Sequence, residues 1–245
     1  MKRNSVFLAL TSLILSAALF TSCNDDGYSL DKFWVSAATV KPLSDNQYYL
    51  QLDDGTTLLP LTASGNPSDR PVQQTRVVAN YTILGDSVQG YSHGVMVNLL
   101  IPILTKDMTV LTAATRDSLG SDPVRVLDYA IADDYLNIHF AIPTAYGSVH
   151  FLNLAKNELS GNPNEYVFTH NAYQTSGPLA EGLIAFDLRT IKETEASPYT
   201  FTVKAQDAEG EEKEFSITYS WDERNNRMFS VIDKHINYNN KMKVR

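Results

Sequence analysis

The sequence contains a single cysteine, Cys23, among its 245 residues. No disulfide can form within one chain, so the fold must rely on its core. The sequence also has a single long apolar run, from Val6 to Phe20. That run is about 15 residues, whereas a membrane-spanning helix needs roughly 20. We therefore predict no transmembrane helix.

Basic residues are also in short supply. Lysine and arginine number 20 against 28 aspartate and glutamate residues, which gives a net charge of −8. Binding to a phosphate backbone depends on Lys and Arg. The acidic balance therefore argues against nucleic acid as a partner.

Motifs for the common chemistries are missing as well. The sequence has no glycine-rich phosphate cradle, no dinucleotide fingerprint and no pair of carboxylates at catalytic spacing. We predict no cofactor and no catalytic residue, and hence a protein that is not an enzyme. A hydrolase remains the weakest alternative.

One stretch does match a catalytic pattern formally. Residues 90–94 read Gly-Tyr-Ser-His-Gly, which fits the nucleophile elbow Gly-x-Ser-x-Gly. An elbow needs a strand before the serine and a helix after it. Here a turn-rich loop over residues 85–94 is expected before an apolar strand, so we predict that Ser92 is not a nucleophile.

Metal ligands are sparse too. The histidines are His93, His139, His150, His170 and His235, and none shows helical metal-site spacing. We expect His139 and His150 to face each other across neighbouring strands as a hydrogen-bonded pair on a solvent face. Two acidic pairs, Asp53-Asp54 and Asp133-Asp134, lack the twelve-residue loop of a calcium site and fit turns better. We predict no metal.

The amino-terminal segment is the most informative part of the chain. Lys2 and Arg3 precede the apolar run, and Leu19-Phe20-Thr21-Ser22-Cys23 resembles a lipobox. This arrangement predicts a lipoprotein signal peptide over residues 1–22, lipidation of Cys23 and a tether over 23–32. Its loss would change the net charge from −8 to −10. The membrane is then a partner through the lipid anchor.

The rest of the chain alternates between strands and turns. Residues 76–84 place Val77, Ala79, Tyr81 and Ile83 on one face, and residues 135–142 alternate with period two. Residues 148–154 are expected to pair behind 135–142. A polar, turn-rich stretch over 105–123 marks a junction. We therefore predict an all-β protein with one domain over 33–112 and a second over 124–225.

Several stretches resemble the NigD-like lipoproteins of Bacteroidetes. They are Phe33-Trp34-Val35, residues 77–84 (VVANYTIL), 91–98 (YSHGVMVN), 117–123 (DSLGSDP), 135–140 (YLNIHF), 150–154 (HFLNL) and 170–173 (HNAY). The resemblance runs from about Cys23 to about Tyr219. It implies an N-terminal OB-like barrel and a C-terminal β-sandwich, with no established activity. Relatives often carry Arg before the His-Asn pair and Asp after it, where this chain has Thr169, Gln174 and Thr175.

OB-like barrels bind oligonucleotides or oligosaccharides. The aromatic residues of the first domain could stack on sugars or fill the core; these are Trp34, Tyr48, Tyr49, Tyr81 and Tyr91. The ligand-binding residues stay unknown at this point. We expect a non-enzymatic envelope lipoprotein, anchored in the outer membrane on its periplasmic face or at the cell surface, that binds another envelope protein or a glycan. The alternative is a bacteriocin immunity-like, envelope-protective protein.

Overall fold

A computed structural model describes residues 32–43, 47–63, 73–207, 210–222 and 243–244. The predicted signal peptide, Cys23, the tether up to residue 31 and His235 lie outside the described residues. Within these ranges strands dominate, and the two helices are short: α2 (Arg116–Leu119) and α3 (Arg189–Thr194). The predicted all-β class is confirmed. None of the described helices is long and apolar enough to cross a membrane.

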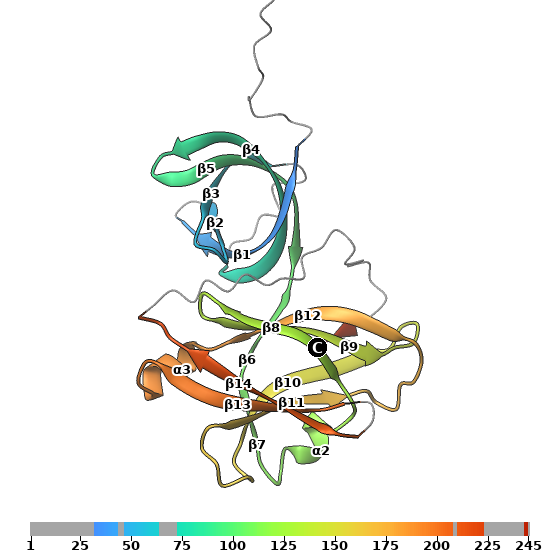
Figure 1. Ribbon diagram of the computed structural model, residues 1–245. Helices are drawn as coiled ribbons and strands as arrows, with labels where there is room; N and C mark the ends of the chain where they lie inside the picture. The colour runs from blue at the N-terminus through green and yellow to red at the C-terminus, as the bar shows by residue number, and fades with distance from the viewer. Residues whose placement is uncertain (1–31, 44–46, 64–72, 208–209, 223–242, 245) are drawn as a thin grey trace, which may run out of the picture.

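The first five strands close into a barrel, drawn above the second domain in Figure 1. Its strand order is β1-β2-β3-β5-β4. The strands are β1 (Trp34–Pro42), β2 (Tyr48–Leu52), β3 (Thr57–Ala63), β4 (Thr75–Val88) and β5 (Tyr91–Pro102).

The barrel core follows the predicted period-two pattern. Val77, Ala79 and Tyr81 of β4 are at most 5% exposed and share one apolar cluster, on which Ile83 packs. β4 and β5 also continue through residues 85–94, so the predicted loop there is wrong. Gln89 and Gly90 form a two-residue turn with φ values of 52° and 84°, the geometry that a tight hairpin requires.

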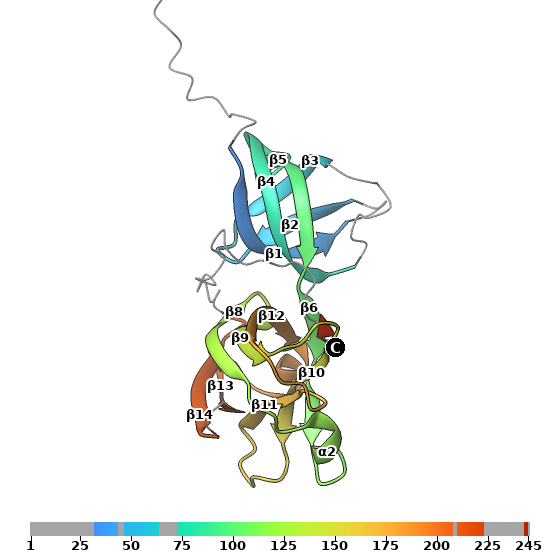
Figure 2. The same cartoon turned by 90° about the vertical axis from the view of Figure 1, so that its right-hand side faces the viewer.

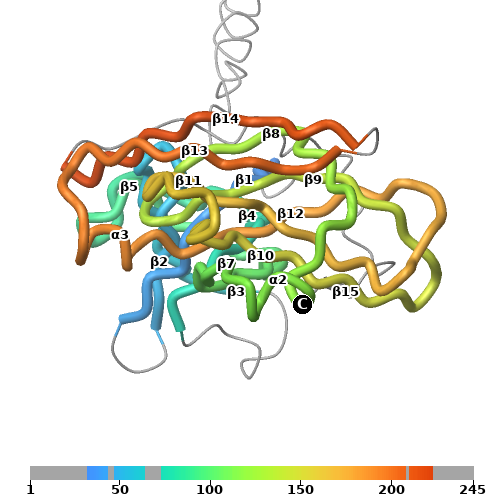
Figure 3. Tube along the Cα trace, turned by 90° about the horizontal axis from the view of Figure 1, so that it is seen from below, coloured from blue at the N-terminus to red at the C-terminus, as the bar shows by residue number. Residues whose placement is uncertain are grey.

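The remaining strands form two sheets that pack face to face. One has the order β14-β13-β11-β10-β15, with β7 also paired to β10, and the other is β6-β12-β9-β8. Seen from below, the strands of the two sheets run in nearly the same direction (Figure 3). The strands are β6 (Leu104–Asp107), β7 (Thr109–Leu111), β8 (Arg125–Ala132), β9 (Tyr135–Pro143), β10 (Val149–Asn157), β11 (Glu165–Asn171), β12 (Leu179–Asp187), β13 (Tyr199–Gln206), β14 (Glu212–Tyr219) and β15 (Lys243–Val244).

Strand β9 shows how the sequence pattern builds the sandwich. Leu136, Ile138 and Phe140 point into the sandwich core and expose no surface. The residues between them were expected on a solvent face, yet Asn137 and His139 are only 4% exposed. That face of the sheet lies toward the barrel (Figure 1), so its polar residues are buried as well.

Two further expectations about the sandwich are wrong. β9 pairs with β8 and β12, whereas β10 pairs with β11 in the other sheet, so 148–154 does not pair behind 135–142. The polar stretch 105–123 is also not simply a linker. β6 pairs with β12 and β7 with β10, which places residues 104–111 in the sandwich sheets although the barrel was predicted to reach residue 112. The physical reason is that Leu104 and Met108 pack against the sandwich core.

Barrel and sandwich meet through both apolar and polar contacts. Val78 and Ile103 pack with Tyr135 and Ala185 across the boundary. Gln74 Nε2 donates to the Tyr135 hydroxyl at 2.9 Å, and Lys41 forms an ion pair with Asp133. Figure 2 shows the chain passing from the barrel through β6 into the sandwich.

Arg76 is the central residue of this boundary and exposes no surface. Its guanidinium donates to both carboxylate oxygens of Asp53, at 2.7 and 3.0 Å, and to Thr39 Oγ1 at 3.1 Å. Its Nε donates to Asn137 Oδ1 of the sandwich at 3.1 Å. One buried cation therefore joins the β2–β3 turn to β9.

Candidate functional site

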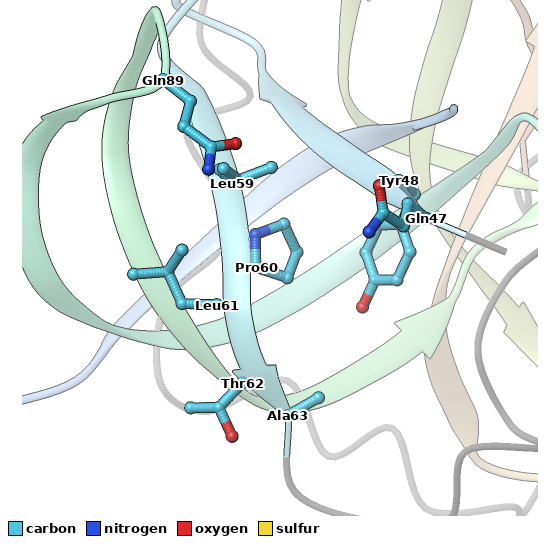
Figure 4. A pocket seen from close by; sticks show the side chains of 8 residues that line it. All are labelled: Gln47, Tyr48, Leu59, Pro60, Leu61, Thr62, Ala63 and Gln89. Carbon is cyan, nitrogen blue, oxygen red and sulfur yellow. The ribbon is translucent and has the colours of Figure 1, made fainter. Parts of the chain in front are cut away.

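A cavity of about 300 Å³ opens in the barrel wall between β2 and β3 (Figure 4). We call it the β2–β3 cleft. It is lined by Gln47 and Tyr48 on one side, by Leu59, Pro60, Leu61, Thr62 and Ala63 on the other, and by Gln89 from the β4–β5 turn. In Figure 4 the Pro60 ring faces Tyr48 across the opening, and Gln89 reaches down toward Leu59. The volume is at the lower end of the range for small-ligand sites.

The cleft exists because the β2–β3 hairpin stops pairing early. The turn is tight: Asp54 Oδ1 accepts from the Thr56 N–H, and Gly55 has φ of 88°. Leu52 N–H donates to Thr56 O, and the described ladder then contains only Gln51 with Thr57 and Leu50 with Leu58.

Proline explains where the ladder ends. Hydrogen-bonded pairs in an antiparallel ladder alternate. Since Leu52 bonds to Thr56, the next bonded positions are Leu50 with Leu58 and then Tyr48 with Pro60. Proline has no N–H to donate there. The described ladder therefore ends at Leu50 with Leu58, and residues beyond this point on both strands line the cleft.

None of the described residues that line the cleft carries a charged side chain. Gln47, Gln89 and Thr62 offer hydrogen-bond donors and acceptors, while Leu59, Pro60 and Leu61 provide an apolar strip; Leu61 is 51% exposed. A site of this kind suits a neutral ligand with both apolar and hydrogen-bonding groups. Sequence reasoning missed it, although a proline within a predicted strand was the available signal.

The aromatic residues of the barrel separate into two groups. Tyr48 and Tyr81 are core residues, 6% and 5% exposed. Tyr49 and Tyr91 are partly exposed and lie against each other with ring centroids 5.2 Å apart. Trp34 is 54% exposed and does not line the cleft.

A second cluster joins three segments at one end of the sandwich. Ser148 Oγ lies 2.8 Å from His150 Nε2, His150 Nδ1 lies 3.0 Å from His170 Nε2, and His170 Nδ1 lies 2.8 Å from the Pro123 carbonyl oxygen. His150 thus pairs with His170 of the neighbouring strand β11. The predicted pairing of His150 with His139 is wrong, because β9 and β10 belong to different sheets.

With both rings neutral, these contacts determine which nitrogen of each histidine carries the proton. A carbonyl only accepts, so His170 carries its proton on Nδ1 and accepts at Nε2 from His150 Nδ1–H. His150 Nε2 is then left to accept from the Ser148 hydroxyl. Desolvation lowers the pKa of both histidines, and for His150 the neighbouring His170 lowers it further. Both rings are therefore neutral near pH 7.

The order serine, histidine, histidine resembles a nucleophile, its base and an orienting group. Both rings, however, expose no surface. A leaving group could not reach His150 Nε2, which general acid catalysis requires. The Ser148 hydroxyl has one proton, and Ala145 O, at 2.8 Å, competes with His150 Nε2 for it. We interpret the cluster as a clamp that holds the loops together.

This clamp brings together three of the stretches that carry the family resemblance. Asp122 N–H donates to His170 O at 2.8 Å, and Asp122 Oδ2 accepts from the Ala172 N–H at 2.6 Å. Gly120 has φ of 77°, and a Cβ there would lie 2.6 Å from His170 O. Only glycine fits such an approach. The exposed turn that follows includes Tyr173, 60% exposed, with φ of 47°.

The formal elbow motif lies in strand rather than at a strand–helix turn. Ser92 is in β5, and its Oγ accepts from the Thr57 N–H at 3.1 Å and contacts Thr57 Oγ1 at 3.2 Å. His93 Nδ1 lies 2.7 Å from Asp86 Oδ1. Strand, not helix, follows the serine, as predicted.

The acidic pairs serve the fold. Asp53 binds Arg76, Asp133 pairs with Lys41, and Asp134 accepts from the Tyr219 hydroxyl at 2.6 Å and pairs with Lys192. Within the ranges that the structure describes, no three His, Cys, Asp or Glu side chains gather as metal ligands. His139 Nε2 lies 2.8 Å from Glu181 Oε2.

The fold therefore defines a two-domain all-β protein with an OB-type barrel followed by a β-sandwich. Two family models match in that order: the NigD-like N-terminal OB domain over residues 37–101, and the NigD-like C-terminal beta sandwich domain over residues 107–219. The chain belongs to the NigD-like family. A comparison with curated proteins gave no match.

Three solved structures illustrate the likeness. A candidate toxin-related protein from Parabacteroides distasonis is 33% identical, with a TM-score of 0.68 over 77% of this chain and 94% of its own. A protein of unknown function from Bacteroides vulgatus is 23% identical, with a TM-score of 0.69 over 82% of this chain and 98% of its own. A NigD-like immunity protein from Bacteroides caccae is 20% identical, with a TM-score of 0.59 over 80% and 99%. The last two share the fold.

Proposed function

We propose that this protein is a non-enzymatic lipoprotein of the bacterial cell envelope that works as a binding or accessory module. The observation that carries the proposal is the β2–β3 cleft, a cavity of about 300 Å³ in the barrel wall whose described lining residues are uncharged. Its partner is another envelope protein or a glycan. The burial of both clamp histidines supports the non-enzymatic part of the proposal.

The envelope location rests on the lipobox-like sequence that ends at Cys23. Lipidation there would anchor the chain in the outer membrane, on the periplasmic face or at the cell surface. A second function is favoured by the names of two relatives. The Bacteroides caccae protein is called an immunity protein, and the 33% identical protein is described as toxin related. A bacteriocin immunity-like, envelope-protective role would use the same anchored binding module.

Site-specific photocrosslinking in intact cells tests the proposal. A diazirine amino acid at Leu61, 51% exposed at the cleft, should give a discrete adduct. The matched control is the same residue at Leu159, 42% exposed in the sandwich, which should give none. Equal adducts at both positions, or none at either, would contradict a binding role for the cleft. A fluorophosphonate probe that labelled Ser92 or Ser148 would contradict the non-enzymatic role.

A further inference from the structure

We propose that the β2–β3 cleft binds an extended polypeptide segment, which pairs with β3 as an added strand. This inference rests on the proposed function and names the class of partner. Addition of a strand to a sheet edge is a general mode of peptide recognition, in which main-chain hydrogen bonds provide the affinity.

The first argument is the backbone of β3. In the described part of the chain, residues 59–63 have strand partners in β5 only, from Leu59 with Gly94 to Ala63 with Val97. Successive residues of a strand direct their N–H and C=O groups to opposite edges, an alternation that the register shift between Pro60 and Thr62 interrupts beyond Pro60. The edge of β3 that faces the cleft therefore presents main-chain groups where β2 has moved away.

Pro60 makes this edge selective. By the ladder alternation, Pro60 directs its carbonyl oxygen toward the cleft and has no N–H to offer. An incoming strand can donate an N–H to that carbonyl, but receives no donor at the same position. The cleft thus favours one register of the added strand, and the proline also keeps the edge from pairing indiscriminately.

The second argument is the chemistry of the lining. Gln47 and Gln89 each carry an amide donor and an amide acceptor, which match the groups of a peptide bond. Leu59 and Leu61 offer apolar contacts for side chains of the added strand. Because no described lining residue is charged, none of them compensates the desolvation of a charged side chain in the cleft. The segment should therefore be uncharged where it contacts β3.

The same lining disfavours a glycan. Sugar rings are usually held by stacking on an exposed aromatic face. The aromatic side chain in the cleft lining is Tyr48, which is 6% exposed. Trp34, with 54% of its surface exposed, lies outside the lining. Backbone pairing is therefore the better match.

The test begins with a random seven-residue peptide library selected against the purified full chain. Enriched peptides are synthesised and titrated into the ¹⁵N-labelled protein. We expect enrichment of uncharged sequences and chemical-shift changes at the amides of Leu59 and Leu61–Ala63. The same peptide with alternate backbone nitrogens methylated should bind at least about tenfold more weakly, because it loses two or three ladder bonds.

Two variants test the site. Pro60→Val supplies the missing N–H, so the hairpin should continue and close the cleft; protection of the amide at position 60 from hydrogen exchange would report closure. Affinity should fall at least about tenfold. Thr62→Trp fills the cleft without relying on this closure and should have the same effect. The matched control is Pro163→Val, at an exposed proline of the β10–β11 loop, which should bind as wild type.

The outcomes are separable from those of the proposed function. Peptides that bind both cleft variants as well as wild type, or that tolerate backbone methylation, overturn the inference. A library that yields no cleft-binding peptide also overturns it. If maltoheptaose, cellohexaose or chitohexaose shifts the β3 amides while peptides do not, the partner is a glycan. The inference then fails and the binding function stands; the crosslinking experiment decides the function independently.

Discussion

Arg76 offers the sharpest test of how the two domains are held together. Its guanidinium exposes no surface, binds Asp53 through two hydrogen bonds, and reaches Asn137 of the sandwich. Replacing Arg76 with Met keeps much of the volume and removes the charge. The substitution leaves the Asp53 carboxylate, whose side chain is 5% exposed, without its cation.

The expected cost follows from these contacts. Removing one partner of a buried ion pair typically destabilises by about 3–5 kcal/mol, because the other charge is left buried. Asp53 lies in a turn, where some water can reach it, which favours the lower end. Asn137 keeps contacts from its Nδ2 to Ala130 O and Tyr135 O, so its lost bond should contribute only about 1 kcal/mol. We predict a total loss of about 3–4 kcal/mol.

The chain provides its own domain-specific reporters. It has two tryptophans: Trp34 on β1 of the barrel, and Trp221, which packs against the sandwich core. Urea unfolding is followed by fluorescence in Trp34→Phe and Trp221→Phe backgrounds. The unfolding free energy of the barrel should fall by most of the predicted loss, and that of the sandwich should fall by about 1 kcal/mol.

The double variant Arg76→Met, Asp53→Asn decides the mechanism. If the stranded charge causes the loss, removing it should restore at least half of the unfolding free energy. A single variant that costs less than about 1 kcal/mol would refute the reasoning. So would a double variant no more stable than the single one.

Three further predictions concern the clamp and the anchor. Gly120→Ala should lower the unfolding free energy by more than about 1–3 kcal/mol, because a clash with His170 adds to the backbone strain. The control Gly161→Ala, with φ of 74° and no neighbour within 4 Å, should show only the loss that the strain causes. Stability should fall as the pH is lowered from 7.5 to 5. The folded-state pKa values of His150 and His170 lie below the unfolded value of about 6.5, so the unfolded chain binds more protons than the folded chain in this window. A His150→Gln variant should show a shallower dependence in urea titrations, and an equal slope would count against the neutral pair. Cys23→Ala should leave the protein soluble or unprocessed, and intact mass of the wild type showing residues 1–22 retained would contradict lipidation.

The local sequence pattern predicted much of the fold correctly. The alternation of Leu136, Ile138 and Phe140, and of Val77, Ala79 and Tyr81, located two core faces correctly. Such patterns depend only on side-chain direction along a strand. The Asp53-Asp54-Gly55 turn was also predictable, because glycine tolerates its positive φ.

What failed depended on contacts between distant segments. The His139–His150 pairing assumed that consecutive strands are neighbours, and here they lie in different sheets. The burial of Asn137 depends on the barrel covering β9, which no period in β9 can reveal. The β2–β3 cleft depends on one missing N–H at Pro60 and on the ladder phase set by the turn.

The junction has a consequence for the order in which the chain becomes structured. Every barrel strand precedes residue 103, so a chain that emerges from its N-terminus can close the barrel early. β6 must wait for β12, whose Ile184 pairs with Leu104 about 80 residues later. Until β12 is available, a closed barrel is followed by β6 as an edge strand without its partner. An unpaired strand edge favours misassembly at this stage.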